Sequence, residues 1–179
     1  ADWPDDWLAI IHANNQIAPT WLRVNAEKGS RTETAAALNE NALKYSLPTF
    51  PENAILLQTA IAPMRLPGWD EGRVTVQDRS AQLAAEALSC REGESVWDMC
   101  AAPGGKSAQL LQSRPAVLLL TDSDPLRLEK ISELFIRLGL QNDGLAIQAL
   151  DATQPLPNDL LHIHGFDWKV IKLTGYRMH

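Results

Sequence analysis

Residues 97–107 read Trp-Asp-Met-Cys-Ala-Ala-Pro-Gly-Gly-Lys-Ser, and this stretch decides the fold. It joins a predicted strand at 95–99 to a predicted helix at 105–113. Its small residues let a ligand approach the backbone, and Gly104 and Gly105 allow a sharp turn. The first N–H groups of the helix have no partner within the helix and attract negative charge. The stretch therefore predicts a ligand-binding loop at the carboxyl end of a strand.

The residues around this loop alternate between strands and helices. A helix is predicted at 80–88, strands at 117–121 and 145–149, a helix at 125–139 and a fourth strand within 165–173. Helix 125–139 has the clearest helical period and ends at Gly139, a typical residue just past a helix end. Strands that alternate with helices of this length form parallel sheets with right-handed crossovers. The pattern predicts an α/β fold, incomplete because too few strands follow for a full doubly wound sheet.

Acidic residues follow two of the predicted strands. Asp122 lies 17 residues after Gly105, close to the spacing of about 20 residues between a glycine loop and a ribose-binding acid. Asp151 follows the next strand, at the same edge of the sheet. The loop and two acids at three successive strand ends indicate a cofactor that contains adenosine. The Gly-x-Gly-x-x-Gly pattern is absent and Ala101 stands where a triphosphate loop needs glycine, so dinucleotide and triphosphate sites are disfavoured.

The first 73 residues differ in pattern and predict a small α+β unit. Its expected elements are a helix at 5–14 with Trp7 in the core, a strand at 21–25, a helix at 30–41 and a strand at 54–58. Ser30 and Glu33 form a capping-box pattern at the start of the second helix. We therefore expect three parts: the α+β unit at 1–73, the first part of the cofactor-binding domain at 74–167 and a basic tail at 168–179.

Composition narrows the classes of protein to which the chain can belong. It has 45% hydrophobic residues and a net charge of -6, which exclude wholesale disorder and disfavour a bulk polyanion binder. Two cysteines are too few for a disulfide framework or a zinc site and favour the reducing cytoplasm. The longest apolar run, 116–120, is far short of the roughly 20 residues of a membrane helix. We expect no membrane contact and no metal.

The sequence of 98–107 resembles, nearly letter for letter, the first motif of the S-adenosylmethionine-dependent RNA cytosine-C5 methyltransferases. Residues 14–25, 66–69 and 72–82 are similar to further segments of that family, and the resemblance extends over roughly 7–167. The most similar branch methylates 16S ribosomal RNA in bacteria. The resemblance implies a Rossmann-like methyltransferase domain, S-adenosyl-L-methionine as cofactor and 16S rRNA as partner. We expect a monomer.

The resemblance also implies roles for individual residues. Asp122 would hold the ribose, and Asp151 would lie by the adenine amino group. Arg23 and Asn25 either contact RNA or tie the small unit together. The methionine end of the cofactor would be cradled by Cys100, Ala101, Ala102, Pro103, Gly104, Gly105 and Lys106.

Catalysis in this family needs residues that the sequence lacks. The family uses a cysteine thiolate in an Asp-Ala-Pro-Cys motif to attack C6 of cytosine. Here Lys172 stands at the aspartate position, and Leu173-Thr174-Gly175-Tyr176 follow it. The agreement ends abruptly after Asp167, a pattern typical of a frameshift or truncation. The catalytic residues are therefore unknown, and we expect the cofactor-binding half of the enzyme, inactive by itself. The alternative is a non-catalytic module that binds cofactor or RNA; a nucleotide-dependent dehydrogenase is disfavoured.

Overall fold

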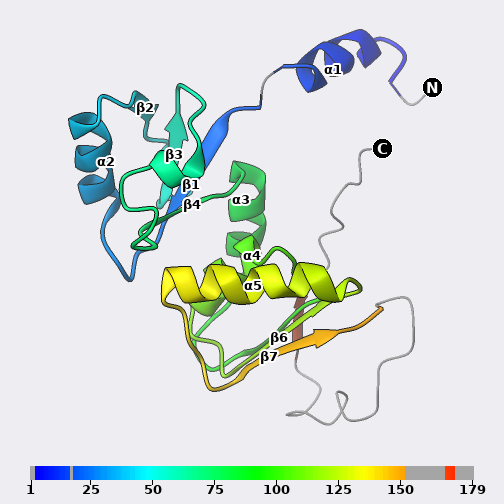
Figure 1. Cartoon of the computed structure of the whole chain (residues 1–179). Coiled ribbons are helices and arrows are strands. Elements are labelled where there is room, and N and C mark those ends of the chain that lie inside the picture. Colours follow the sequence, from blue (N-terminus) through cyan, green and yellow to red (C-terminus); the bar gives the residue numbers. More distant parts are fainter. Residues whose placement is uncertain (1–2, 17, 152–167, 172–179) are drawn as a thin grey trace.

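The computed structural model describes residues 3–16, 18–151 and 168–171 and contains two four-stranded sheets (Figure 1). The helices are α1 (Trp7–Asn14), α2 (Arg31–Glu40), the short 3-10 helix η1 (Pro63–Arg65), α3 (Arg79–Ala87), α4 (Gly105–Leu111) and α5 (Pro125–Leu138). The strands are β1 (Thr20–Val24), β2 (Tyr45–Ser46), β3 (Ala54–Leu57), β4 (Val74–Val76), β5 (Ser95–Asp98), β6 (Val117–Asp122), β7 (Leu145–Ala149) and β8 (Trp168–Ile171).

The first sheet is antiparallel, in the order β2-β3-β1-β4, and confirms the predicted small α+β unit. Leu22 at its centre lies opposite Ile55 of β3 and Val76 of β4. The buried core of this unit consists of Leu22, Val24, Leu38, Ile55, Leu57, Leu66 and Val74. β4 begins just past residue 73 and yet pairs with β1, so the first sheet is completed by residues that follow the predicted boundary. The division at 73 stays a prediction.

Helix α1 departs from its expected place in the core. None of its residues is buried, and Trp7 is 51% exposed. In Figure 1 the helix stands apart from both sheets. The prediction that Trp7 belongs to the core is therefore wrong. An apolar face on an eight-residue helix fixes which side chains point the same way, but it does not supply a surface to pack against.

The second sheet is parallel, in the order β7-β6-β5-β8, as the alternating pattern predicts. β5 and β6 lie in the middle, and the predicted fourth strand is present as β8 beside β5. All four strands run in one direction, so β5, β6 and β7 end at one edge of the sheet. This edge carries Asp98 and Asp122 as the last residues of β5 and β6. Asp167, the last residue of the predicted second part, lies outside the described residues.

Helices α3, α4 and α5 cover one face of the parallel sheet. Alternate strand residues, such as Val96, Leu118 and Leu120, point into this layer, and their neighbours Trp97 and Leu119 form a smaller cluster on the other face. The helix residues in the larger core include Ala85, Ala108, Leu110, Leu111, Leu128, Ile131, Phe135 and Leu138. Gly139 ends α5 in a left-handed conformation, φ +69°, as predicted. None of the described helices is long and apolar enough to cross a membrane.

Candidate functional site

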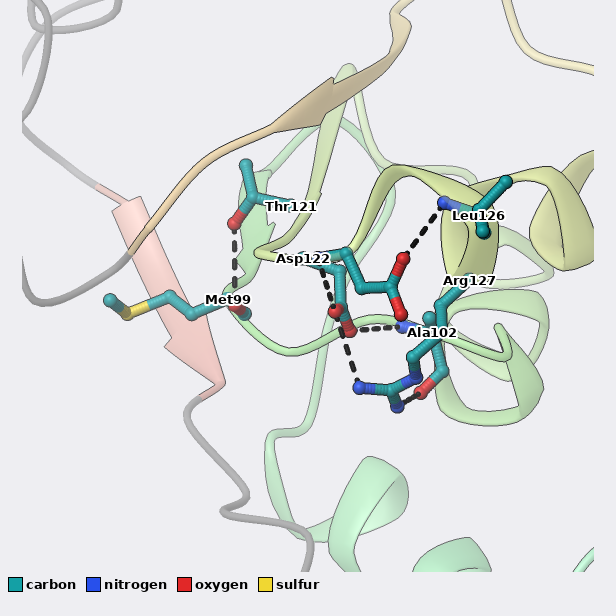
Figure 2. A network of polar contacts seen from close by, with 7 residues as sticks. Met99, Ala102, Thr121, Asp122, Leu126 and Arg127 are labelled. Carbon is teal, nitrogen blue, oxygen red and sulfur yellow. Dashed lines mark hydrogen bonds and ion pairs between the residues drawn. The ribbon is translucent and has the colours of Figure 1, made fainter.

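The loop between β5 and α4 is tied to the neighbouring strand by its backbone. The Ala101 N–H donates to the Thr121 carbonyl at 3.0 Å, and the Gly104 N–H donates to the Ala101 carbonyl at 2.7 Å. The Thr121 hydroxyl donates to the Met99 carbonyl at 3.4 Å (Figure 2). These bonds hold the loop at the carboxyl ends of β5 and β6, the edge where open parallel sheets bind ligands.

Gly104 occupies a position that strongly favours glycine. Its φ is +98°, a conformation that costs other residues about 1–2 kcal/mol. A Cβ added there would lie 3.3 Å from the Ile131 Cα, because α5 packs directly against the loop. The next residue, Gly105, is more open: its added Cβ would be 3.8 Å from the nearest atoms, which belong to the Gln77 side chain. The Gly-Gly pair thus combines a sharp turn with room above the backbone.

Asp122 holds the loop through its carboxylate. Its Oδ2 accepts the Ala102 N–H at 3.2 Å, and its Oδ1 accepts the Asp124 N–H at 3.2 Å (Figure 2). The side chain is only 3% exposed. Each carboxylate oxygen can accept two hydrogen bonds. Among the described residues Oδ2 accepts only from Ala102, which leaves it one acceptor position. The acid predicted to hold ribose therefore lies in direct contact with the predicted cofactor loop.

Arg127 is a member of this site that the sequence reasoning missed. Its Nη1 donates to Asp122 Oδ1 at 3.2 Å, and its Nη2 donates to the Ala102 carbonyl at 2.8 Å (Figure 2). The guanidinium thus joins the acid to the loop from the first turn of α5. The sequence contained a signal for this contact. Side chains in the first turn of a helix point back toward its N-terminus, so Arg127, five residues after Asp122, points toward the end of β6.

Asp98 lies beneath the loop and is fully buried. Its Oδ2 accepts the Ser107 hydroxyl at 2.8 Å, and its Oδ1 has no hydrogen-bond partner among the described residues. Burial raises the pKa of this carboxyl above its usual range, while the Ser107 hydroxyl and the positive charge of Lys106 oppose the shift. The bond to Ser107 connects the end of β5 to the first turn of α4.

Asp151 stands at the same edge. It follows β7, and the N–H of its neighbour Leu150 donates to the Asp122 carbonyl at 3.0 Å. The side chain is exposed. The structure therefore brings together three of the features that the sequence singled out: the loop at 100–106, Asp122 and Asp151. Their individual roles stay predictions.

The chemistry of this edge fits S-adenosylmethionine. Two acids at this edge, Asp122 and Asp151, suit a ligand that carries a sulfonium and an ammonium group. Lys106, half-buried in the first turn of α4, can face the carboxylate of its methionine part. The acceptor position left on Asp122 suits a ribose hydroxyl. The Gly-x-Gly-x-x-Gly pattern of dinucleotide sites is absent, which disfavours a dinucleotide.

Arg23 and Asn25 do not face solvent. They are 2% and 1% exposed. Arg23 donates to the side-chain oxygens of Gln77 at 2.7 Å and Gln112 at 2.5 Å. Asn25 donates to the carbonyls of Gly72 at 2.9 Å and Leu138 at 3.1 Å. Both side chains are engaged between the first sheet and the helices of the second, so of the two alternatives their contacts favour a structural role, at this junction, over RNA contact.

Two family models match the chain. The RsmF/B-like methyltransferase ferredoxin-like domain matches residues 1–63, and the 16S rRNA methyltransferase RsmB/F model matches residues 85–168. The chain belongs to the RsmB/F methyltransferase family. The first model covers β1, β2 and β3 of the antiparallel sheet, and the second covers β5, β6 and β7 of the parallel sheet with the loop, Asp122 and Asp151.

Relatives and a solved structure agree with membership in the RsmB/F family. The chain is 40% identical over 143 residues to ribosomal RNA small subunit methyltransferase B of Cronobacter sakazakii, covering 79% of this chain and 33% of that protein. It is 43% identical over 149 residues to the protein of the same name from Klebsiella pneumoniae, covering 79% and 34%. A methyltransferase homologue from Pyrococcus horikoshii superposes with a TM-score of 0.72 at 27% identity, over 82% of this chain and 48% of that one. The chain spans about one third of the length of the curated relatives it matches.

Proposed function

We propose that the chain is the S-adenosylmethionine-binding part of an RNA methyltransferase that modifies C5 of cytosine in 16S rRNA. The observation that carries the proposal is the bond from the Ala102 N–H to Asp122 Oδ2, which joins the small-residue loop to the acid at the next strand end. The names of the relatives support 16S rRNA as the substrate. Because ribosomal RNA lies in the bacterial cytoplasm, the proposal includes a cytoplasmic location. It also includes the expected monomer.

Each residue of the site has a part in this proposal. Residues 100–106 enclose the methionine end of the cofactor, Asp122 accepts hydrogen bonds from the ribose, and Asp151 accepts from the adenine amino group. Arg127 orients the Asp122 carboxylate by donating to its Oδ1 at 3.2 Å. The bound cofactor supplies an electrophilic methyl group. The protein residues named here bind and orient it.

The two thiols of the chain do not supply a nucleophile for this reaction. Cytosine C5 is a poor nucleophile until a thiolate adds to C6 of the flipped-out base. Cys90 precedes the amino end of β5, at the edge opposite to the cofactor loop. Burial and the charge of Glu94 raise the pKa of the Cys90 thiol, which lowers its thiolate fraction. Cys100 lies inside the loop that we assign to the cofactor. We therefore propose that these 179 residues bind the cofactor but transfer no methyl group by themselves.

Methyl transfer tests this proposal. Tritiated S-adenosylmethionine and unmodified 16S rRNA are incubated with the 179-residue chain and with the chain carrying Asp-Ala-Pro-Cys and the rest of the domain after residue 171. We expect label in the RNA only with the extended chain. Incorporation by the shorter chain that is lost in Cys100→Ser would make Cys100 the nucleophile and contradict the proposal. Failure of the extended chain to label RNA would contradict the assigned reaction.

A further inference from the structure

The junction between the two sheets contains a buried cation, Arg23, whose hydrogen bonds among the described residues do not go to a carboxylate. Arg23 is 2% exposed, and burial lowers the pKa of its guanidinium to about 10. Its bonds go to two glutamine oxygens, and its Nη2 has no hydrogen-bond partner among the described residues. A buried charge is costly unless it is compensated. Here Gln112, the C-cap of α4, brings the guanidinium to the negative end of that helix dipole.

Gln77 connects this cation to the beginning of the same helix. Its Oε1 accepts from Arg23 at 2.7 Å, and its Nε2 donates to the Gln109 side-chain oxygen at 3.2 Å. The carbons of its side chain face Gly105, at 3.8 Å from the position of an added Cβ. Gln77 follows β4 and is 6% exposed. It therefore lies between the first sheet and Gly105, the first residue of α4.

The contacts on α4 fall on one helical face. Gly105, Gln109 and Gln112 are spaced by four and three residues, which places them on one side of a helix. This side meets Gln77 and Arg23 of the N-terminal unit. α4 has only seven residues, and so short a helix is not stable alone. Its position is set by what packs against it.

We propose that Arg23 and Gln77 are positioning residues for the cofactor loop, acting through α4. The proposal rests on the proposed function, since the ligand of the loop is S-adenosylmethionine. Apolar packing would tolerate small shifts of α4, whereas directional amide and guanidinium bonds fix its register and orientation. The antiparallel unit thereby sets the affinity of a site that lies in the other sheet.

A second group of junction contacts provides a matched control. Arg137 donates to the carbonyls of Trp69 at 2.7 Å and Val74 at 3.1 Å, and its guanidinium lies 3.8 Å from the centre of the Trp69 ring. These contacts also join the two sheets, but they sit in the last turn of α5. The cofactor loop contacts the opposite end of that helix, through Arg127. Loss of Arg137 weakens the junction without touching α4.

The test compares Gln77→Met with Arg137→Met in the full chain. Methionine keeps the length of Gln77 and its packing against Gly105 but removes both hydrogen bonds. We expect Gln77→Met to raise the Kd for S-adenosylhomocysteine about tenfold at a temperature where the protein is folded. Arg137→Met is expected to lower Tm and to leave that Kd within twofold. Gln77→Glu keeps the acceptor for Arg23 but loses the donor to Gln109, so we expect it to raise that Kd by less than Gln77→Met does.

Backbone hydrogen exchange without ligand at residues 108–111, whose N–H groups donate within α4 or to Gly104, separates this inference from the proposed function. We expect faster exchange in Gln77→Met and no change in Arg137→Met. A lower Tm in Gln77→Met with unchanged Kd and unchanged exchange would make the network merely structural and overturn the inference. If Gln77→Met exchanges faster but the wild-type protein does not bind S-adenosylhomocysteine, the result would support positioning of the loop and overturn the proposed ligand.

Discussion

Replacement of Gly72 by alanine is expected to destabilise the chain by roughly 2–5 kcal/mol, as the sum of backbone strain and overpacking. Gly72 has a φ of +69°, which alanine adopts only with strain. An added Cβ would lie 2.1 Å from the Arg137 carbonyl oxygen and 2.8 Å from the Leu138 Cα. Both are backbone atoms at the end of α5, so neither can move aside unless the helix moves away from Gly72.

Gly93→Ala is the matched control for this prediction. Gly93 also has a positive φ, +82°, but nothing lies within 4 Å of its added Cβ. Only backbone strain remains, so we expect a loss of about 1–2 kcal/mol. Urea unfolding of both variants and the wild type measures the difference. Equal losses would mean that the close approach of residues 72 and 137 does not contribute to stability.

Asp122→Asn is expected to weaken S-adenosylmethionine binding by about ten- to a hundredfold. Hydrogen bonds to a charged group contribute roughly 1.5–3 kcal/mol, and each 1.4 kcal/mol corresponds to a factor of ten in Kd. Asparagine keeps the size of the side chain but removes the negative charge and one acceptor oxygen. In Asp122 the two carboxylate oxygens accept separately from the Ala102 N–H and the Arg127 guanidinium, and these bonds hold the loop. The single oxygen of asparagine can replace only one of these two acceptors.

Asp124→Asn provides the control for this prediction. Asp124 caps α5 by accepting the Leu126 N–H at 2.9 Å, and asparagine is an equally good N-cap. We therefore expect unchanged stability and a Kd within twofold of the wild type. Equilibrium dialysis with labelled cofactor measures both affinities. A similar loss in the two variants would show that lowered negative charge at this edge, and not a bond from Asp122, explains the effect.

Local signals in the sequence predicted much of the fold. The capping box of Ser30 and Glu33 is present, with the Ser30 hydroxyl accepting the Glu33 N–H at 3.1 Å. Gly139 ends α5, and the parallel strands follow the alternation of apolar runs and helices. Each of these features depends on residues a few positions apart, so the sequence pattern is sufficient to reveal it. The loop at 100–106 was found in the same way.

The wrong prediction for Trp7 and the question left open for Arg23 and Asn25 concern residues whose environment comes from distant parts of the chain. Trp7 lies on an apolar helix face, but no described residue buries it. Arg23 and Asn25 are polar residues of a type that contacts RNA, yet their partners Gln112 and Leu138 are 89 and 113 residues away. No local pattern signals that a polar side chain is buried at a junction between two sheets. Arg127 was missed although its partner Asp122 is only five residues away. An arginine in an exposed helical turn is common and does not by itself indicate a site.

Calorimetric titration of the wild-type chain with S-adenosylmethionine, and separately with NAD, tests the central claim most directly. The account predicts binding of S-adenosylmethionine at one site per chain, and weaker or undetectable binding of NAD, because the dinucleotide glycine pattern is absent. Tighter binding of NAD, or no heat with S-adenosylmethionine in a folded protein, would contradict it.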